Sequence, residues 1–274
     1  MKAAKSIVNT EDIKVPPVVY KYRTWESEKH KTLITKRTVF MARPSSFEDE
    51  KEFRNYKRYD LMNDQEVYNK YLELSIIHNP GHTLDYHSNY AMEWTQRAPF
   101  RDELYLKEAQ EKHFREYDDR IGVLSLSLYN DNLSMWNYYS CKGNGLCVGL
   151  NTKKLFPLMG EGGPVNYPYD GVPIINVTDS FDIQTWKQVY NKEVKWAFEK
   201  EYRFTVFDKT GLTDYNRGIV LPAECFEEVI FGWAMPRNVK TSIINACDVS
   251  GLKVAFFEAS INGDIVSINY IRIR

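Results

Sequence analysis

The sequence predicts an α+β fold in which a mixed, mainly antiparallel sheet is interrupted by a helical insertion. Short runs of β-branched and aromatic residues, bounded by Pro, Gly and Asn, recur along the chain and are typical of strands. Residues 50–118 are instead charged, with apolar and aromatic side chains at helical spacings. Asn262-Gly263, between two strand-like runs, favours the tight turn of a hairpin. The 274 residues, 43% of them hydrophobic, are enough for a single domain, residues 1–274, that carries the insertion.

The elements before and within the insertion follow from local composition. VVYKYR (18–23) follows Pro16-Pro17 and predicts a first strand. RTVFMARP (37–44) predicts a second strand, which ends at its proline. In the insertion, HNPGH (78–82) interrupts one helical pattern, and residues 88–118 carry another.

After the insertion, strands alternate with helices. Asn132 is a suitable N-cap for a short helix over 132–139, and residues 179–197 predict an amphipathic helix that begins near Ser180 or Asp182. The remaining expected elements are strands at 121–128, 201–207 and 226–233, a turn and then a strand at 143–150, a strand edge with turns at 164–173, a helix at 237–248, and a closing hairpin of 253–259 and 264–273. We expect the helices to lie on one side of the sheet.

Charge, hydropathy and cysteine content narrow the class of protein. Lys and Arg number 36 and Asp and Glu 37, so the chain has no net charge that would draw it strongly to nucleic acid or to an anionic membrane. No run of about 18 apolar residues is present, and the first twenty residues lack the apolar segment of a signal peptide. The cysteines show no C-x-x-C spacing and predict reduced thiols: Cys141, Cys147, Cys225 and Cys247. We therefore expect a cytoplasmic protein.

An E-x-E-x-R segment places two carboxylates where a strand is expected to begin. Strand alternation puts Glu199, Glu201 and Arg203 on one face and turns Tyr202 and Phe204 into the core. Two interpretations of this face remain open. It is either the polar face of a strand with a cross-strand ion pair, or the edge of a functional cleft, where a cation neutralises the two repelling carboxylates.

Other polar residues in strand-like runs are candidates to join this pair. Tyr22-Arg23 end the first expected strand, and Ser125 and Ser127 alternate with leucines in a later one. Trp196 and Phe198, which precede the two glutamates, predict a packed and half-buried mouth at this place. If these strands are neighbours in the sheet, their polar side chains converge on one cleft.

Six segments, in one order, span nearly the whole chain. They are YKYR (20–23), FMARPSSFEDEKE (40–52), VLSLSLYNDNLSMWNYYSCKGNGLCVGL (123–150), VNY (165–167), WAFEKEYRF (196–204) and IVLPAECFEEVIFG (219–232). In this order they resemble a bacterial family known as the domain of unknown function numbered 2971. The chain departs from that family at residues 47–50, which read Phe-Glu-Asp-Glu in place of Phe-Asn-Asp-Pro. The resemblance implies a bacterial, cytoplasmic protein with no settled activity.

Arginine, serines and glutamates also stand in an order that resembles ADP-ribosyltransferases of the Arg–Ser–Glu type. Those enzymes carry an Arg at the end of a first core strand, a Ser-x-Ser strand and an E-x-E pair at a later strand. The resemblance implies NAD as a possible substrate, whose pyrophosphate Arg23 would grip bidentately. Glu201 would stabilise the ribosyl cation, and Glu199 would meet the acceptor. Ser127 would fix the catalytic carboxylate.

The same resemblance implies further nucleotide-binding residues and partners. Tyr22 and Ser125 would join Arg23 at the nucleotide, and Trp136 would be an aromatic wall for a base or nicotinamide, although burial in the core explains Trp136 more simply. The expected partners are a nucleotide-type small molecule and an unidentified acceptor macromolecule, as for a bacterial effector or defence protein. The alternative is a noncatalytic ligand- or protein-binding module with a structural ion network of Arg23, Glu199, Glu201 and Arg203.

Two further polar groups have the residue types of metal ligands, but simpler interpretations are stronger. The first lies in an expected turn and comprises His78, His82, His87 and Asp85. A solvated loop explains this group better than a zinc site does. A zinc site needs three or four ligands, and further protein groups must hold those ligands in position. The second lies at an expected helix start, where carboxylates suit the helix dipole, and comprises Asp49, Glu50, Glu52 and Asp60. The segment 142–145, Lys-Gly-Asn-Gly, lacks the order of a phosphate-binding loop and predicts a tight turn. No metal is expected.

Overall fold

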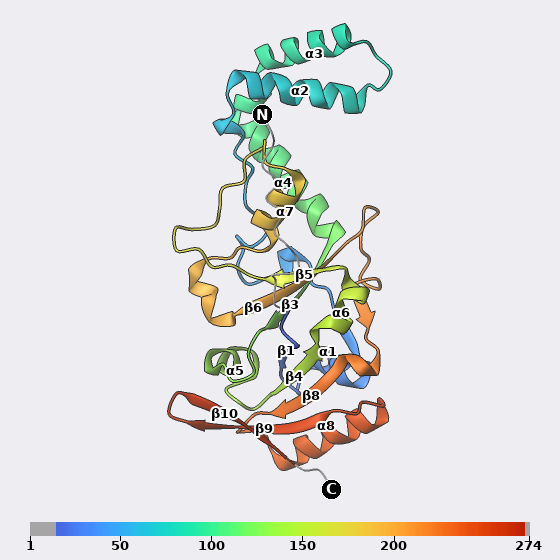
Figure 1. Ribbon diagram of the computed structural model, residues 1–274, viewed down its shortest axis with the longest axis vertical. Coiled ribbons are helices and arrows are strands. Elements are labelled where there is room, and N and C mark those ends of the chain that lie inside the picture. The colour runs from blue at the N-terminus through green and yellow to red at the C-terminus, as the bar shows by residue number, and fades with distance from the viewer. Residues whose placement is uncertain (1–14, 272–274) are drawn as a thin grey trace.

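The computed structural model describes residues 15–271 and confirms the α+β class (Figure 1). The prediction about a signal peptide falls largely on residues 1–14, outside the described part. The main sheet contains β1 (Val18–Arg23), β3 (Ile121–Ser127), β4 (Leu146–Asn151), β5 (Glu161–Pro164), β6 (Glu201–Phe207), β8 (Phe226–Phe231), β9 (Ala255–Asn262) and β10 (Ile265–Tyr270). A separate small sheet pairs β2 (Thr38–Phe40) with β7 (Gly218–Val220).

The main sheet is mixed and mainly antiparallel, as predicted. Its strand order is β10-β9-β8-β4-β1-β3-β6-β5, and β8 and β9 are its parallel neighbours. The closing hairpin exists, but Asn262 pairs with Ile265, so its two-residue turn is Gly263-Asp264 and not Asn262-Gly263. The reason is that the positive φ falls on Gly263, which is the first turn residue and not the second.

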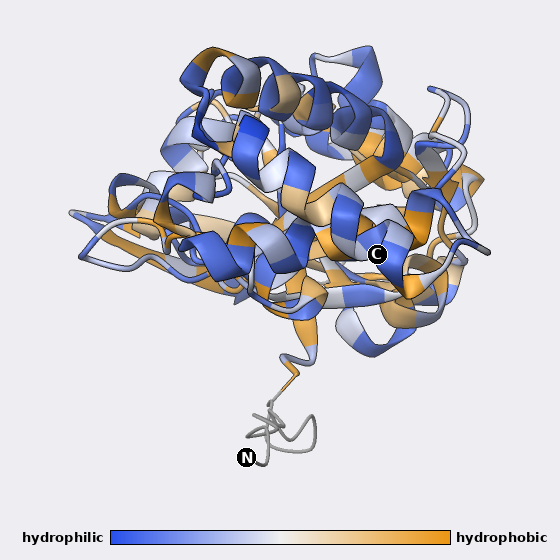
Figure 2. Cartoon of the chain, turned by 90° about the horizontal axis from the view of Figure 1, so that it is seen from above, coloured by the Kyte–Doolittle hydropathy of each residue, from blue (hydrophilic) through white to orange (hydrophobic). Residues whose placement is uncertain are grey.

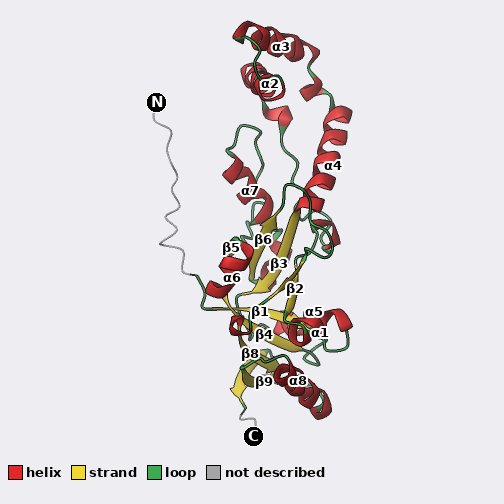
Figure 3. Cartoon of the chain, turned by 90° about the vertical axis from the view of Figure 1, so that its right-hand side faces the viewer, coloured by secondary structure: helices red, strands yellow, loops and turns green. Residues whose placement is uncertain are grey.

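The sheet divides where β1 meets β3. All six residues of β1 pair with β4, whereas β1 and β3 share the single pair Tyr20–Ser127. The two strands therefore diverge beyond this point, and the part made of β3, β5 and β6 separates from the part that holds β1, β4 and β8 (Figure 3). Side chains beyond this pair, toward the end of β1 and the start of β3, consequently face a space between the two parts of one sheet.

Helices cover both faces of the sheet, which corrects the expectation of one side. The helices are α1 (Glu28–Thr35), α2 (Asp64–His78), α3 (Leu84–Arg97), α4 (Glu103–Arg120), α5 (Leu133–Tyr139), α6 (Thr152–Met159), α7 (Phe181–Val189) and α8 (Arg237–Val249). In β4, Val148 packs in the core shared with α1, α6 and α8, whereas its neighbour Cys147 packs in the core shared with α5. Alternate strand residues point to opposite faces, so both faces of β4 are buried. Figure 2 shows hydrophilic residues on the outer sides of the helices, over more hydrophobic strands.

The helical insertion begins later than residue 50. Helix α2 starts after Asn63, whose side chain accepts a hydrogen bond from the Glu66 amide while Glu66 bonds back to Asn63. Helices α2 and α3 form a hairpin at the far end of the molecule, and α4 returns to the sheet and continues directly into β3 (Figures 1 and 3). Residues 47–58 are instead a loop beside the sheet. None of the helices in the described part is both long and apolar enough to cross a membrane.

The segment before β6 is not one helix over 179–197, as the pattern predicted. Helix α7 begins after the predicted cap Ser180 but ends at Val189. A separate 3₁₀ helix, η4, follows as Val194–Glu199. The other 3₁₀ turns are η1 (Pro44–Ser46), η2 (Tyr59–Leu61), η3 (Pro99–Arg101) and η5 (Ala223–Cys225). The break brings Lys192, between α7 and η4, beneath the end of η4.

Candidate functional site

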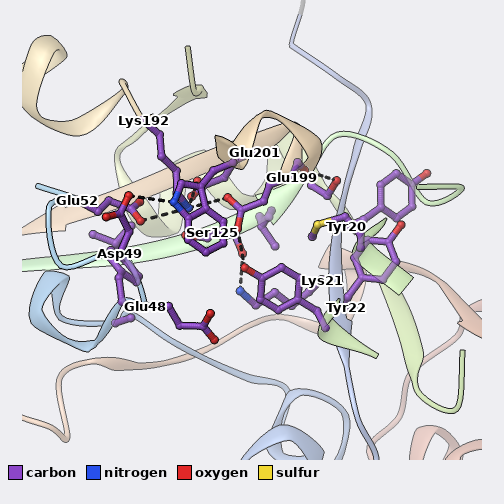
Figure 4. A pocket seen from close by; sticks show the side chains of 18 of the residues that line it. Tyr20, Lys21, Tyr22, Glu48, Asp49, Glu52, Ser125, Lys192, Glu199 and Glu201 are labelled. Carbon is purple, nitrogen blue, oxygen red and sulfur yellow. Dashed lines mark hydrogen bonds and ion pairs between the residues drawn. The ribbon is translucent and has the colours of Figure 1, made fainter. Parts of the chain in front are cut away.

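A cavity of about 440 Å³ lies at the division of the sheet (Figure 4). Its walls come from β1, β3, α1, α5, the loop that contains Glu48, Asp49 and Glu52, and the junction of η4 with β6. Six of the seven residues predicted from the sequence line it: Tyr22, Arg23, Ser125, Ser127, Glu199 and Glu201. The volume lies within the range of small-molecule pockets, which is roughly 300–1,000 Å³.

The two glutamates reach the cavity through a sharp turn of the backbone. Glu199 is the last residue of η4, Lys200 adopts the left-handed conformation with φ 46°, and Glu201 is the first residue of β6. The pair therefore lies on a helix end and a strand start, rather than on one strand as predicted. Both carboxylates still face the cavity, and Figure 4 shows them side by side.

The serines of β3 face the polar side of β6 by sheet register. Ser127 lies opposite Glu201, and Ser125 lies opposite Arg203. The Ser127 hydroxyl donates to the backbone carbonyl oxygen of Glu199 at 2.9 Å. Ser127 therefore holds the backbone turn that carries the two glutamates, and this buried hydroxyl does not bond to either carboxylate.

Glu199 is held from two sides. Its Oε1 accepts a hydrogen bond from the Tyr139 hydroxyl at 2.5 Å, and its Oε2 accepts one from Lys192 Nζ at 2.6 Å. Burial and the nearby Glu199 charge raise the pKa of Tyr139, so this phenol keeps its proton and remains a donor. Glu199 is thus fixed between a neutral donor and a cation.

Glu201 is bound by the planar fork of Arg203. Arg203 Nε donates to Oε1 at 2.8 Å and Nη2 donates to Oε2 at 2.7 Å, while both side chains are buried. Burial alone would raise the pKa of Glu201, but the charge and hydrogen bonds of Arg203 and the charge of Lys192 outweigh it and lower this pKa to about 2. Glu201 is therefore a carboxylate at neutral pH. Each carboxylate oxygen has a second lone pair, so Glu201 can accept a further hydrogen bond from a ligand.

Two members of this charge cluster were missed by sequence reasoning. Lys192 Nζ lies 3.2 Å from Glu52, 2.6 Å from Glu199 and 3.8 Å from Glu201. Glu52 also accepts a hydrogen bond from Arg203 Nη2. We call these five residues the acidic wall: Glu52, Glu199 and Glu201 with Lys192 and Arg203. A lone lysine in a loop carries no recognisable pattern, and Glu52 was assigned to a helix start that the structure does not contain.

In the acidic wall, burial and ion pairing shift the pKa values of the charged groups in opposite directions. Burial lowers the pKa of Lys192, but the three nearby carboxylates raise it. The net effect is a raised pKa. Burial raises the pKa of Glu52 against the opposing charges of Arg203 and Lys192. With all five groups ionised, three carboxylates face two cations. The wall therefore carries one negative charge in excess, next to an open cavity.

Arg23 reaches the cavity from the end of β1 without a carboxylate partner among the described residues. Its Nη1 bonds only to the carbonyl oxygen of Tyr22, at 3.3 Å. Burial lowers the pKa of Arg23 to about 10, so it remains a cation at neutral pH. The predicted tight turn lies against the Arg23 backbone and requires glycine there, because a Cβ at Gly145 would lie 2.2 Å from the Arg23 carbonyl oxygen.

Trp136 is the predicted site residue that does not line the cavity. It is fully buried, its Nε1 donates to the carbonyl oxygen of Asn130 at 2.8 Å, and its ring lies edge-on to Tyr22 at 5.2 Å. It supports Tyr22 from behind rather than forming a wall. Trp196 lines the cavity instead, with Nε1 donating to Asp49 at 3.0 Å.

The other polar groups named from the sequence lie in different environments. His87 is buried and exchanges a hydrogen bond with Ser75 at 2.9 Å across the α2–α3 hairpin, and His82 stacks on Tyr86. No group of three His, Cys, Asp or Glu side chains suited to a metal was found within residues 15–271. The four cysteines are free thiols, and three of them are buried.

Comparison of the chain with protein-family models, curated proteins and solved structures gave no match. The two resemblances drawn from the sequence therefore stay predictions, and the geometry of the cavity carries the functional argument.

Proposed function

We propose that the cavity binds NAD and that the protein is an ADP-ribosyltransferase-like enzyme. The observation that carries this proposal is that one cavity collects Arg23, the Ser125–Ser127 strand, Glu199 and Glu201 from segments far apart in the chain. Arg23 supplies an unpaired cation for the pyrophosphate, and the acidic wall supplies excess negative charge for a developing ribosyl cation. The order of these residues along the chain, which resembles that of ADP-ribosyltransferases of the Arg–Ser–Glu type, supports the same proposal.

The proposed reaction breaks the bond between ribose C1′ and the nicotinamide nitrogen. The bonding electron pair leaves with nicotinamide, and positive charge builds on the ribose. Glu201, kept ionised by Arg203, stabilises that charge. A nucleophilic oxygen or nitrogen of the acceptor, or water, then bonds to C1′. The proton of the acceptor passes to Glu199, which is already oriented by Tyr139 and Lys192, whereas the proton of an attacking water passes to the solvent.

A noncatalytic binding module is the second candidate. The observation that favours it is that Arg203 occupies both oxygens of Glu201, as a purely structural ion pair would. In this alternative, the acidic wall fixes η4 to β6, and the cavity binds its ligand without cleaving it. Under either proposal the free thiols and the absence of a membrane-crossing helix in the described part favour the cytoplasm, and an effector or defence role fits an enzyme of this class.

The test is release of nicotinamide from labelled NAD. We expect turnover by the wild-type protein, and a loss of roughly 100-fold or more in Glu201→Gln, the scale for one transition-state stabiliser. Glu199→Gln should spare hydrolysis and impair transfer to an acceptor. Tyr138→Phe is the matched control, because its hydroxyl bonds to Glu48 at the exposed rim and not to the acidic wall.

The same assay separates the two candidates. No nicotinamide release by folded wild-type protein, at any NAD concentration, would contradict the enzyme and leave the binding module. Circular dichroism of each variant shows whether it remains folded. Ser125→Ala, at a half-buried position of β3, provides a second variant if Glu201→Gln does not fold.

A further inference from the structure

A second wall of the cavity carries three basic side chains. Lys21 and Arg23 are two residues apart on β1 and therefore share a face, and His30 of α1 lies beside them. We call these residues the basic wall. Their polar contacts within the described chain are with the carbonyl oxygen of Ser125, the carbonyl oxygen of Tyr22 and the hydroxyl of Thr24. None of the three pairs with a carboxylate in the part of the chain that the structure describes.

The basic wall is electrostatically unfavourable without a ligand. Burial and the charge of Arg23 lower the pKa of Lys21 far below its usual value, although Glu201 and Glu199 across the cavity oppose this shift. Burial and the charges of Arg23 and Lys21 also lower the pKa of His30, against a hydrogen bond that the ring donates to the Thr24 backbone. Three basic groups that repel one another in a half-buried cavity wall gain most from an anion placed between them.

We propose that Lys21, Arg23 and His30 form one subsite for the phosphate groups of the ligand, with pyrophosphate as the preferred group. This assignment rests on the proposed function, because NAD supplies such a pyrophosphate. It adds Lys21 and His30, and it fixes the direction of the ligand. The phosphates lie on the basic wall, and the ribose to be attacked lies across the cavity at Glu199 and Glu201. Figure 4 shows the Lys21 side chain apart from Glu52 and Lys192.

The subsite is tested first in the wild-type protein, by titration of inorganic pyrophosphate while the histidine ring resonances are followed by NMR. Of the five histidines, His30 lies on the basic wall, and the other four lie in the helical insertion at 78, 82, 87 and 113. We expect pyrophosphate to shift the His30 resonance and to raise the pH at which it titrates, because a nearby anion stabilises imidazolium. The other four are internal controls and should not move.

Affinities measured by calorimetry give the second test. Lys21→Met should weaken pyrophosphate and ADP-ribose about tenfold or more, as expected when a charge-assisted hydrogen bond is lost. It should leave nicotinamide riboside, which has no phosphate, unchanged. Lys153→Met removes an exposed lysine of α6 as the matched control and should change no affinity.

Three results would overturn the subsite. One is an unmoved His30 resonance in pyrophosphate. Another is equal weakening of all ligands by Lys21→Met, and the third is equal affinity for sulfate and pyrophosphate, which marks a general anion patch. Failure of the proposed function is a separate result: pyrophosphate binding at His30 without nicotinamide release from NAD would reject the enzyme and keep the subsite.

Discussion

The two walls of the cavity differ in how their charges are satisfied. On the acidic wall, Arg203 and Lys192 contact all three carboxylates, and the groups hold one another in place. On the basic wall, the hydrogen bonds of Lys21 and Arg23 within residues 15–271 go to backbone carbonyl oxygens. Charges that are paired internally can support a fold without a ligand, whereas buried cations without a counter-charge favour binding of one. The comparison assigns rigidity to the acidic wall and ligand capture to the basic wall.

Removal of Arg203 should produce the largest effect on stability. Arg203→Met leaves Glu201 and Glu52 buried without their strongest partner, and we expect a loss of roughly 3–5 kcal/mol in the free energy of unfolding. Urea denaturation measures it. Arg58→Met is the control, because the Arg58–Asp60 pair is exposed to solvent and should contribute little to stability. A small loss at Arg203 would mean that the acidic wall is not structural.

Acid should weaken the acidic wall through Glu201. The folded pKa of about 2 lies below the ordinary value of 4.5, so the stabilisation is complete above pH 4.5 and is lost as pH falls toward 2. We expect Glu201 to account for about 2–3 kcal/mol of this loss, measured by urea denaturation between pH 5 and pH 2. Glu201→Gln should flatten the acid dependence. Glu52→Gln, in the same cluster, should not, because the pKa of Glu52 is raised. Equal flattening by both would contradict the assignment.

On the basic wall, the affinity for the ligand should depend on the planar shape of the Arg23 guanidinium. Arg23→Lys keeps the charge but loses the bidentate fork, so we expect NAD binding to weaken by roughly 1–3 kcal/mol with little change in stability. Calorimetry on both proteins measures the affinity. An unchanged affinity in Arg23→Lys would show that the wall offers only charge, and absence of NAD binding to the wild type would remove NAD as the ligand.

Much of the sheet could be predicted because its signals are local. The alternation in β6 correctly predicted the burial of Tyr202 and Phe204, which are 1% and 0% exposed. The polar face of that strand was the harder question. Arg203 is also fully buried, because Glu52, 151 residues earlier in the chain, covers it. Pattern alone does not report which distant loop covers a strand face.

The candidate site was predicted in part for the same reason. Ser127 and Glu201 were placed in strands by their apolar neighbours, and the register of β3 against β6 then brought them together. Lys21 and Lys192 gave no sequence signal, because a single lysine is ordinarily a solvated surface residue. Their significance depends on burial and on partners from other segments, which only the folded chain defines.

The sharpest contrast between the walls is the stability of two lysine variants, and the effect at Lys21 is the smallest that we expect. Lys21→Met should stabilise the ligand-free protein by roughly 1 kcal/mol, because burial and the charge of Arg23 disfavour the charged form of Lys21 in the fold. Lys192→Met should destabilise it, because three carboxylates then lose a shared partner. The two substitutions are chemically identical, so the difference between their effects reports the surroundings of each lysine.

Thermal unfolding without ligand and with pyrophosphate measures the stability of both variants. Pyrophosphate should stabilise the wild type more than Lys21→Met, because a ligand stabilises the fold in proportion to its affinity. Destabilisation of similar size by both variants would mean that Lys21 is paired in solution, and the distinction between the walls would then be wrong.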